Sequence, residues 1–355
     1  MHEMERSCKM RLIKIVGFAV AALALVWVVL AFNAGMFVPH DERLAVEPGA
    51  FTPDVFASQK KILDLGTRQI AYLEMGQGEP VILLHGCPFS TYEWRDVAPA
   101  LAKHFRVIAP DLIGLGDTPV RLNEDYRLPE DVKMVQALMD KLRIKSARFI
   151  GHDHGGAMVQ LLMQHDPNRV DMAILTNVEA YDLWPSKPEI PDLELITNPI
   201  TSPLIYQALQ FRAVQRHMYA IAVANPATLT DKTLDGFAAT HLASGLRWQR
   251  LRRFFVWQLD PTHNHLTMEA VPAMRQFAKP TLILWGEKDT NFGADIAIRL
   301  AKDIPGVAGL QWMKNSAHLP MLEEPDAYGA AALRFFTDGS VSDDARDALL
   351  SARKN

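Results

Sequence analysis

Short apolar runs alternate with helix-like stretches along most of the chain beyond residue 60. Two runs, Lys61–Asp64 and Gln69–Met75, alternate in polarity on either side of Gly66, which is typical of a hairpin at the edge of a sheet. Six further runs have the length and character of buried strands: Val81–Leu84, Phe105–Ala109, Ala147–Ile150, Met172–Thr176, Thr281–Trp285 and Leu310–Met313. Because helix-like stretches separate most of these runs, the pattern predicts an α/β fold with a mostly parallel eight-stranded sheet flanked by helices.

One long interval interrupts this alternation, from about residue 179 to residue 277. It is rich in helix formers and aromatic residues and poor in strand-like runs. An insertion of this kind predicts a helical cap over the carboxyl ends of the strands, where open α/β sheets bind their ligands. Four arginines in the interval are expected on a solvent-exposed helix face: Arg247, Arg250, Arg252 and Arg253.

The N-terminal region carries a different signal. Ile15–Phe32 is an unbroken apolar run, and four basic residues, Arg6, Lys9, Arg11 and Lys14, precede it. At about 1.5 Å per residue this run can cross a hydrocarbon layer of about 30 Å, especially if the helix continues through Val38. The basic residues predict a cytoplasmic N-terminus, with the folded part beyond the apolar run on the periplasmic or extracellular side.

A cleaved signal peptide is the competing interpretation of this run. Signal peptides usually have an apolar region of about 7 to 15 residues, and Phe32-Asn33-Ala34 is a poor small-x-small cleavage site. An uncleaved membrane anchor is therefore favoured. The predicted organisation is a cytoplasmic stub and anchor (1–39), a linker (40–60), an α/β core in two parts (61–178 and 278–338), a helical cap (179–277) and a polar tail (339–355).

Composition narrows the range of partners. The chain has 355 residues, 49% of them hydrophobic and 22% charged, and a net charge of −4. These values are ordinary for a globular protein and provide no basic field for nucleic acid. A small neutral organic substrate and water are the expected partners, together with the membrane, while the oligomeric state is not determined by the sequence.

The first candidate for chemistry is Asp153, within Gly151-His152-Asp153-His154-Gly155. A buried strand precedes this motif and a helix-like stretch follows it, which is the arrangement of a nucleophile elbow. An aspartate is already anionic at neutral pH, so it needs no base before it attacks. The substitution of aspartate for the usual serine predicts displacement of a leaving group from a saturated carbon, with an alkyl ester left on the enzyme.

Three further motifs follow predicted strands. His85-Gly86-Cys87-Pro88 places the backbone N–H of Cys87 where, with that of His154, it would hold a developing oxyanion. Asp289 and His318 follow later strands, and the chain order nucleophile, acid, histidine is that of a hydrolase triad. Glu179 is an alternative acid, because it also lies just past a strand.

These motifs carry a resemblance to a known family. From about Ile62 to Phe336 the chain resembles the Asp-nucleophile branch of the α/β-hydrolase superfamily, which holds epoxide hydrolases and haloalkane dehalogenases. The stretches His85–Arg95 and Ile108–Gly116 are especially similar to dehalogenases, and Val178-Glu179-Ala180 resembles the dehalogenase branch that takes its acid after the sixth strand.

Two departures from this resemblance affect the expected substrate. Dehalogenases usually hold the halide between a tryptophan after the nucleophile and an asparagine after the His-Gly pair, whereas this chain has His154 and Cys87 there. Epoxide hydrolases usually protonate the ring oxygen through cap tyrosines, for which Tyr206 and Tyr219 are the candidates. The chain is therefore expected to be a membrane-anchored epoxide hydrolase, with haloalkane dehalogenase as the alternative.

Two other classes of function remain open. The clusters His152-Asp153-His154 and Thr262-His263-Asn264-His265 allow a metal-dependent hydrolase, although adjacent residues of an elbow point in different directions. A non-catalytic binding protein is disfavoured, because every triad position carries a usable group. No cofactor and no metal are predicted.

Overall fold

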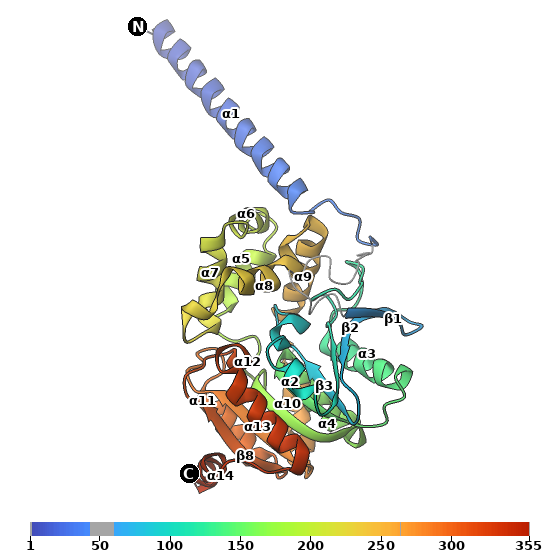
Figure 1. The fold of residues 1–355 in the computed structure, drawn as a ribbon. Coiled ribbons are helices and arrows are strands. Elements are labelled where there is room, and N and C mark those ends of the chain that lie inside the picture. Colours follow the sequence, from blue (N-terminus) through green and yellow to red (C-terminus); the bar gives the residue numbers. More distant parts are fainter. Residues whose placement is uncertain (1, 43–59, 263, 355) are drawn as a thin grey trace.

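A single eight-stranded sheet forms the centre of the molecule (Figure 1). The computed structural model describes residues 2–42, 60–262 and 264–354, so most of the predicted linker lies outside it. The strands are β1 (Lys60–Asp64), β2 (Gln69–Met75), β3 (Pro80–Leu84), β4 (Arg106–Pro110), β5 (Ala147–Asp153), β6 (Val170–Val178), β7 (Thr281–Gly286) and β8 (Val307–Met313). Their order is β1-β2-β4-β3-β5-β6-β7-β8, with β2 antiparallel to both neighbours and all other pairs parallel. The predicted fold class is confirmed.

Helices cover both faces of the sheet. In β3, Ile82 and Leu84 belong to one buried cluster and Val81 and Leu83 to another, because successive strand residues point to opposite faces. The first cluster includes residues of α3 (Leu128–Lys141), α4 (His154–His165) and α11 (Ala294–Asp303). The second includes residues of α2 (Ala98–Leu101) and α13 (Pro325–Asp338). This burial on both sides explains the continuous apolar character of the parallel strands.

The predicted polar tail contains a packed helix, α14 (Asp343–Lys354). Ala345, Leu349 and Ala352 are buried, and the spacing of these residues places them on one helical face. That face lies beside β8 and α11. The tail therefore closes the edge of the sheet, although most of its residues are polar.

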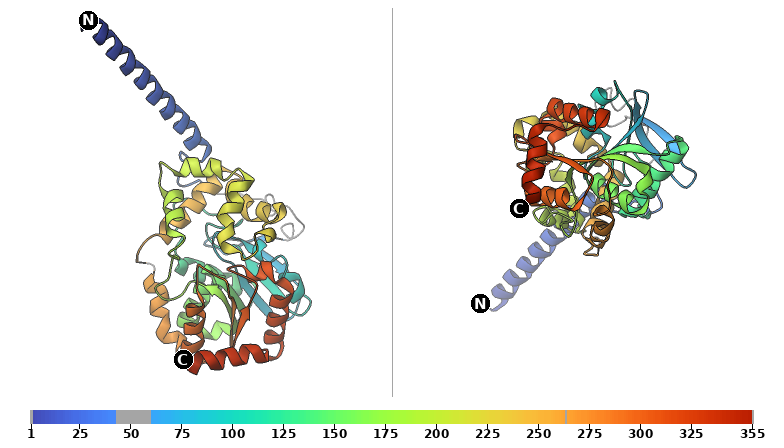
Figure 2. Two further views of the ribbon diagram at one scale, coloured as in Figure 1. Left: turned by 90° about the vertical axis from the view of Figure 1, so that its left-hand side faces the viewer. Right: turned by 90° about the horizontal axis from the view of Figure 1, so that it is seen from below.

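Between β6 and β7 the chain is helical, as expected for a cap. The elements are α5 (Ile190–Thr197), α6 (Ser202–Ala208), α7 (Arg212–Tyr219), η4 (Ala220–Ala222), η5 (Pro226–Thr228), α8 (Asp231–Leu242), α9 (Gly245–Gln258) and α10 (Asn264–Met274). Helices α5 to α9 lie between the sheet and the N-terminal helix (Figures 1 and 2). Helix α10 instead packs against α4 of the sheet layer.

The expectation of an exposed arginine face is wrong for two of its four residues. Arg247 and Arg250 on α9 have fully buried side chains. Arg247 Nη2 lies 2.8 Å from Asp117 Oδ1, and Arg250 donates to the carbonyl oxygens of Gly116 and Thr118. The local pattern of α9 could not reveal this, because the partners come from a distant loop after β4.

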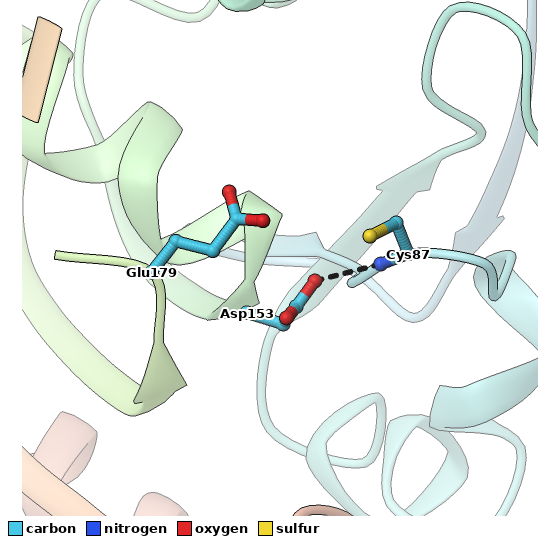
Figure 3. Close-up of side chains that lie close together, drawn as sticks. All are labelled: Cys87, Asp153 and Glu179. Carbon is cyan, nitrogen blue, oxygen red and sulfur yellow. Dashed lines mark hydrogen bonds between the residues drawn. The ribbon is translucent and has the colours of Figure 1, made fainter. Parts of the chain in front are cut away.

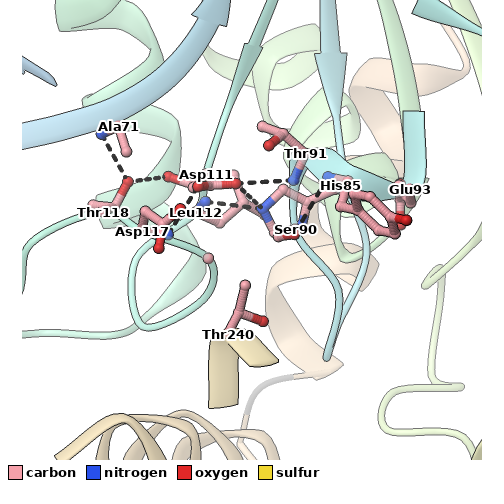
Figure 4. Close-up of polar contacts among 12 residues, drawn as sticks. Ala71, His85, Ser90, Thr91, Glu93, Asp111, Leu112, Asp117, Thr118 and Thr240 are labelled. Atoms are coloured by element: carbon pink, nitrogen blue, oxygen red, sulfur yellow. Dashed lines mark hydrogen bonds and ion pairs between the residues drawn. The ribbon is translucent and has the colours of Figure 1, made fainter. Parts of the chain in front are cut away.

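Residues after β4 also bind Lys60. The sequence-based organisation assigned Lys60 to the linker, but this residue begins β1. Lys60 Nζ lies 2.6 Å from Asp111 Oδ2 and 3.0 Å from Asp117 Oδ2, with all three side chains buried. Asp111 Oδ1 in turn accepts a hydrogen bond from the backbone N–H of Thr91 at 2.8 Å (Figure 4). The network therefore joins the start of the sheet and the cap to the segment that follows the His-Gly-Cys-Pro motif.

The N-terminal helix α1 (His2–Asn33) projects away from the rest of the molecule (Figure 2). Its segment Lys9–Asn33 is long and apolar enough to cross a membrane. A signal sequence near the N-terminus has the same properties, so length and composition alone do not establish an anchor.

Candidate active site

Asp153 occupies a sharp turn between β5 and α4. Its backbone has φ 51° and ψ −117°, a left-handed φ that is uncommon for a residue with a side chain. The flanking glycines permit this turn: a Cβ on Gly155 would lie 2.2 Å from the Leu84 carbonyl oxygen, and a Cβ on Gly151 would lie 2.6 Å from that of Gly155. The strained turn thus presents the Asp153 carboxylate at the carboxyl edge of the sheet.

The Asp153 carboxylate has two partners, one for each oxygen. The backbone N–H of Cys87 donates to Oδ1 at 2.8 Å (Figure 3), and His318 Nε2 lies 3.5 Å from Oδ2. Burial alone would raise the pKa of Asp153, but the hydrogen bond and charge of His318 outweigh it and hold this pKa well below its usual range. The Asp153 carboxylate therefore stays ionised although it is buried.

His318 is held from its other side by Asp289. The Nδ1 atom of His318 lies 2.9 Å from Asp289 Oδ2. Asp289 is itself fixed by the Asn177 side chain, which donates to Oδ2 at 2.7 Å, and by the Asn291 backbone N–H, which donates to Oδ1 at 2.8 Å. Burial would lower the pKa of His318, but the charges of Asp289 and Asp153 raise it well above its ordinary value. Sequence reasoning missed Asn177, which lies near the end of β6 and belongs to no recognised motif.

Glu179 does not contact His318. Its Oε2 lies 3.0 Å from Nδ1 of His154, whose Nε2 faces Asp131 Oδ2 at 3.8 Å. Burial would lower the pKa of His154, but the charge of Glu179 and the nearby Asp131 raise it to about 10. The His154 ring is enclosed by aromatic residues. It does not line the apolar cavity that lies beside Cys87, Glu179 and His318.

A largely apolar cavity lies beside these groups. Cys87, Glu179 and His318 belong to its lining, and most of the remaining surface comes from apolar residues of α5 to α9. Tyr219 also lines it, and burial raises the pKa of this phenol above its ordinary value. Tyr206 is not among the lining residues. Its hydroxyl donates to the Leu242 carbonyl oxygen at 3.2 Å. The structure therefore brings one of the two expected cap tyrosines to the cavity.

Two lining residues were absent from the sequence-based expectations. Asn291 Nδ2 donates to Glu189 Oε1 at 2.8 Å, which joins the loop after β7 to the start of α5. Burial and the charge of Asp153 raise the pKa of Glu189 to about 7. Asn291 could have been noticed from its position two residues after Asp289, whereas no local signal marks Glu189.

The proposed metal clusters are not supported by the chemistry of the site. His152 Nδ1 lies 3.3 Å from Glu93 and its Nε2 donates to the His318 carbonyl oxygen at 2.9 Å, so the rings of His152 and His154 turn away from Asp153. Within the described residues, Cys87, Asp153 and Glu179 form the group with suitably close ligand atoms (Figure 3). Burial raises the pKa of the Cys87 thiol above its ordinary value. His263 of the second cluster lies outside the described residues.

Comparison with known proteins identifies the family of the chain. The family model for the alpha/beta hydrolase fold matches residues 79–325. The chain is 26% identical over 302 residues to haloalkane dehalogenase 2 of Mycobacterium tuberculosis, covering 81% of this chain and 98% of that protein. It is 31% identical over 211 residues to bifunctional epoxide hydrolase 2 of Sus scrofa, covering 59% of this chain and 36% of that protein. An alpha/beta hydrolase fold protein from Burkholderia ambifaria matches with a TM-score of 0.63 and 27% identity, covering 78% of this chain and 99% of that one.

Proposed function

We propose that this chain, which belongs to the α/β-hydrolase fold family and is a hydrolase related to haloalkane dehalogenases and epoxide hydrolases, hydrolyses epoxides through an ester on Asp153. The observation that carries the proposal is the pairing of Asp153 with both the Cys87 N–H at 2.8 Å and His318 at 3.5 Å. This pairing favours a carboxylate nucleophile with a base already in place for the next step.

In the first step an Asp153 oxygen attacks an epoxide carbon and the carbon–oxygen bond of the ring breaks. Tyr219, at the cavity wall, donates its proton to the ring oxygen. Ester formation removes the negative charge of Asp153, which is one of the two charges that raise the pKa of His318. His318 then loses its extra proton, which restores the Tyr219 phenol, and becomes the neutral base that the second step requires.

In the second step His318, oriented by Asp289, takes a proton from water while the water oxygen attacks the ester carbonyl carbon. The backbone N–H groups of Cys87 and His154 are the expected donors to the developing oxyanion. Collapse of this intermediate expels the diol oxygen, which takes the proton from His318. The proton of the new carboxyl group returns to His318, so Asp153 and His318 regain their starting charges.

Haloalkane dehalogenation is the second candidate. It is favoured by the match to haloalkane dehalogenase 2, which covers 98% of the length of that relative. A departing halide needs N–H donors, and the residue after the nucleophile is a natural position for one. Here that residue is His154, whose ring is bound to Glu179 and does not line the cavity. The lack of a side-chain donor from this residue to the cavity favours the epoxide.

A mixed panel of epoxides and haloalkanes tests the substrate class. Diol formation without halide release supports the epoxide proposal, and halide release without diol formation contradicts it. Tyr219→Phe should lower epoxide turnover by about 10²-fold or more, because the alkoxide loses its proton donor. Tyr206→Phe is the matched control and should retain activity, since its hydroxyl is bound to the Leu242 carbonyl oxygen. Asp153→Asn supplies the inactive reference.

We further propose that α1 anchors the enzyme, with the N-terminus in the cytoplasm and the catalytic part on the other side. The basic residues Arg6, Lys9, Arg11 and Lys14 before the apolar segment support this orientation. The full chain should stay with membranes after carbonate extraction, and its N-terminal peptide should remain in the mature protein by mass spectrometry. Loss of that peptide would identify a cleaved signal instead.

A further inference from the structure

The end of α1 is bound to the cap rather than leading away from it. Trp27 Nε1 donates to the Ile200 carbonyl oxygen at 3.0 Å, and Gln249 Nε2 donates to that of Ala34 at 2.8 Å. Gly35 and Gly245 are so close that a Cβ on Gly35 would lie 2.4 Å from the Gly245 carbonyl carbon. These contacts define the position of the cap along α1. Trp27 is the contact residue nearest to the N-terminus among them.

The length of α1 then places the cap relative to a membrane. Lys14 is the last charged residue before the apolar segment, and Trp27 lies thirteen residues beyond it. At 1.5 Å per residue this separation is about 20 Å, which is less than the roughly 30 Å of a hydrocarbon layer. Trp27 must therefore lie within the outer half of the bilayer, and the cap segment bound to it lies at the same depth.

The composition of that cap segment suits this depth. From Leu195 to Phe211 the chain has no charged residue and no histidine. Besides Leu195, which is 44% exposed, three of its apolar side chains are exposed: Ile200 at 67%, Leu204 at 48% and Phe211 at 67%. We define these three residues as the cap patch. An uncharged, exposed apolar surface beside a membrane-spanning helix is what a lipid-facing surface requires.

Residues close to the cap patch in the sequence line the cavity. Leu193 of α5, Leu209 after α6 and Met218 of α7 face the cavity. Ile221 of η4 does both, since it lines the cavity and is 38% exposed. At Ile221 the cavity lining therefore reaches the outside of the cap.

We propose that the cap patch is immersed in the outer lipid leaflet and that the cavity receives lipophilic substrates from the bilayer. The occupant of the patch is the acyl-chain region of the membrane. This inference rests on the anchored form of the proposed function.

Photocrosslinking in the full chain tests the immersion without depending on activity. A benzophenone amino acid is placed at Leu204, at Leu23 on the exposed face of α1, or at Leu350 on α14, and the protein is reconstituted in phosphatidylcholine liposomes. Leu350 is 50% exposed and lies near the C-terminus, at the end of the molecule opposite α1 (Figure 1). Lipid adducts at positions 23 and 204 but not at 350 are expected.

The other outcomes overturn different statements. Adducts at position 23 alone, or equal yields at 204 and 350, overturn the immersion of the cap patch and leave the anchor intact. Adducts at neither 23 nor 204 overturn the anchor and the inference together.

Kinetics test the route of entry. In liposomes, the double variant Ile200→Asn, Leu204→Gln should raise KM for a long-alkyl epoxide about fivefold or more and leave its kcat unchanged. Its constants for a short water-soluble epoxide, and both sets of constants for the matched variant Leu350→Gln, should not change. Equal changes for the two epoxides, or none, would overturn entry from the bilayer.

Discussion

His318 Nε2 lies 3.5 Å from Asp153 Oδ2, on the side of the imidazole opposite to the nitrogen that binds Asp289. In the proposed mechanism, this position gives His318 two successive uses. It stabilises the anionic nucleophile before attack, and it stands beside the ester carbonyl after attack, where a water molecule must be activated. The predictions below separate these uses and the groups that support them.

Replacing His318 should stop the reaction after its first chemical step. In His318→Gln the ester on Asp153 should accumulate, and turnover should fall by about 10²- to 10⁴-fold, because general-base assistance is lost. Mass spectrometry of the protein after incubation with an epoxide measures the adduct. Asp153→Asn should show none. An unmodified His318→Gln protein that still lacks turnover would contradict the two-step scheme.

The two candidate acids should differ in effect. Asp289→Asn should slow ester hydrolysis by about 10²-fold or more, since the carboxylate that orients and charges His318 is lost. Glu179→Gln should slow this step far less, because Glu179 binds His154 instead. Single-turnover measurements that separate ester formation from its hydrolysis test the order, and a larger effect of Glu179→Gln would assign the acid to Glu179.

Glu189 should make stability depend on pH in a defined direction. Its pKa is about 7 in the folded protein against 4.5 as the ordinary value. Between these values the folded state holds a proton that the unfolded state has lost, so the free energy of unfolding falls as pH rises. Glu189→Gln should match the parent at pH 4 and exceed it at pH 8 by on the order of 1–3 kcal/mol.

Unfolding midpoints of the two proteins at several pH values measure this difference. Glu194→Gln, at an exposed position of the same helix α5, is the control and should follow the parent at every pH. A Glu189→Gln protein that parallels the parent over the whole range would show that Glu189 has no raised pKa.

The buried pair of Arg247 and Asp117 should matter for stability. Arg247→Met removes the guanidinium that pairs with the buried Asp117 carboxylate and should destabilise the fold by about 3–5 kcal/mol, as is usual when one member of a buried pair is removed. The free energy of unfolding by denaturant measures the effect. Arg346→Met, which removes an exposed pair with Asp343, should change little. Equal effects of the two substitutions would contradict a stabilising role of the buried network.

Much of this protein was determined by local patterns in the sequence. The alternation of apolar runs with helical stretches predicted all eight strands. Each strand could be recognised because its residues either alternate in polarity or form a short apolar run. The order of Asp153, Asp289 and His318 at strand ends predicted their convergence, because parallel strands end at one edge of a sheet.

Only the tertiary structure decided which distant groups meet. Arg247 is buried because a loop after β4 presents Asp117 to it. Glu179 pairs with His154 rather than with His318. Tyr219 reaches the cavity whereas Tyr206 does not, and Glu189 reaches it from the start of a cap helix. The physical reason is common to all four: burial and electrostatic partners depend on contacts between segments far apart in the chain, which no local period records.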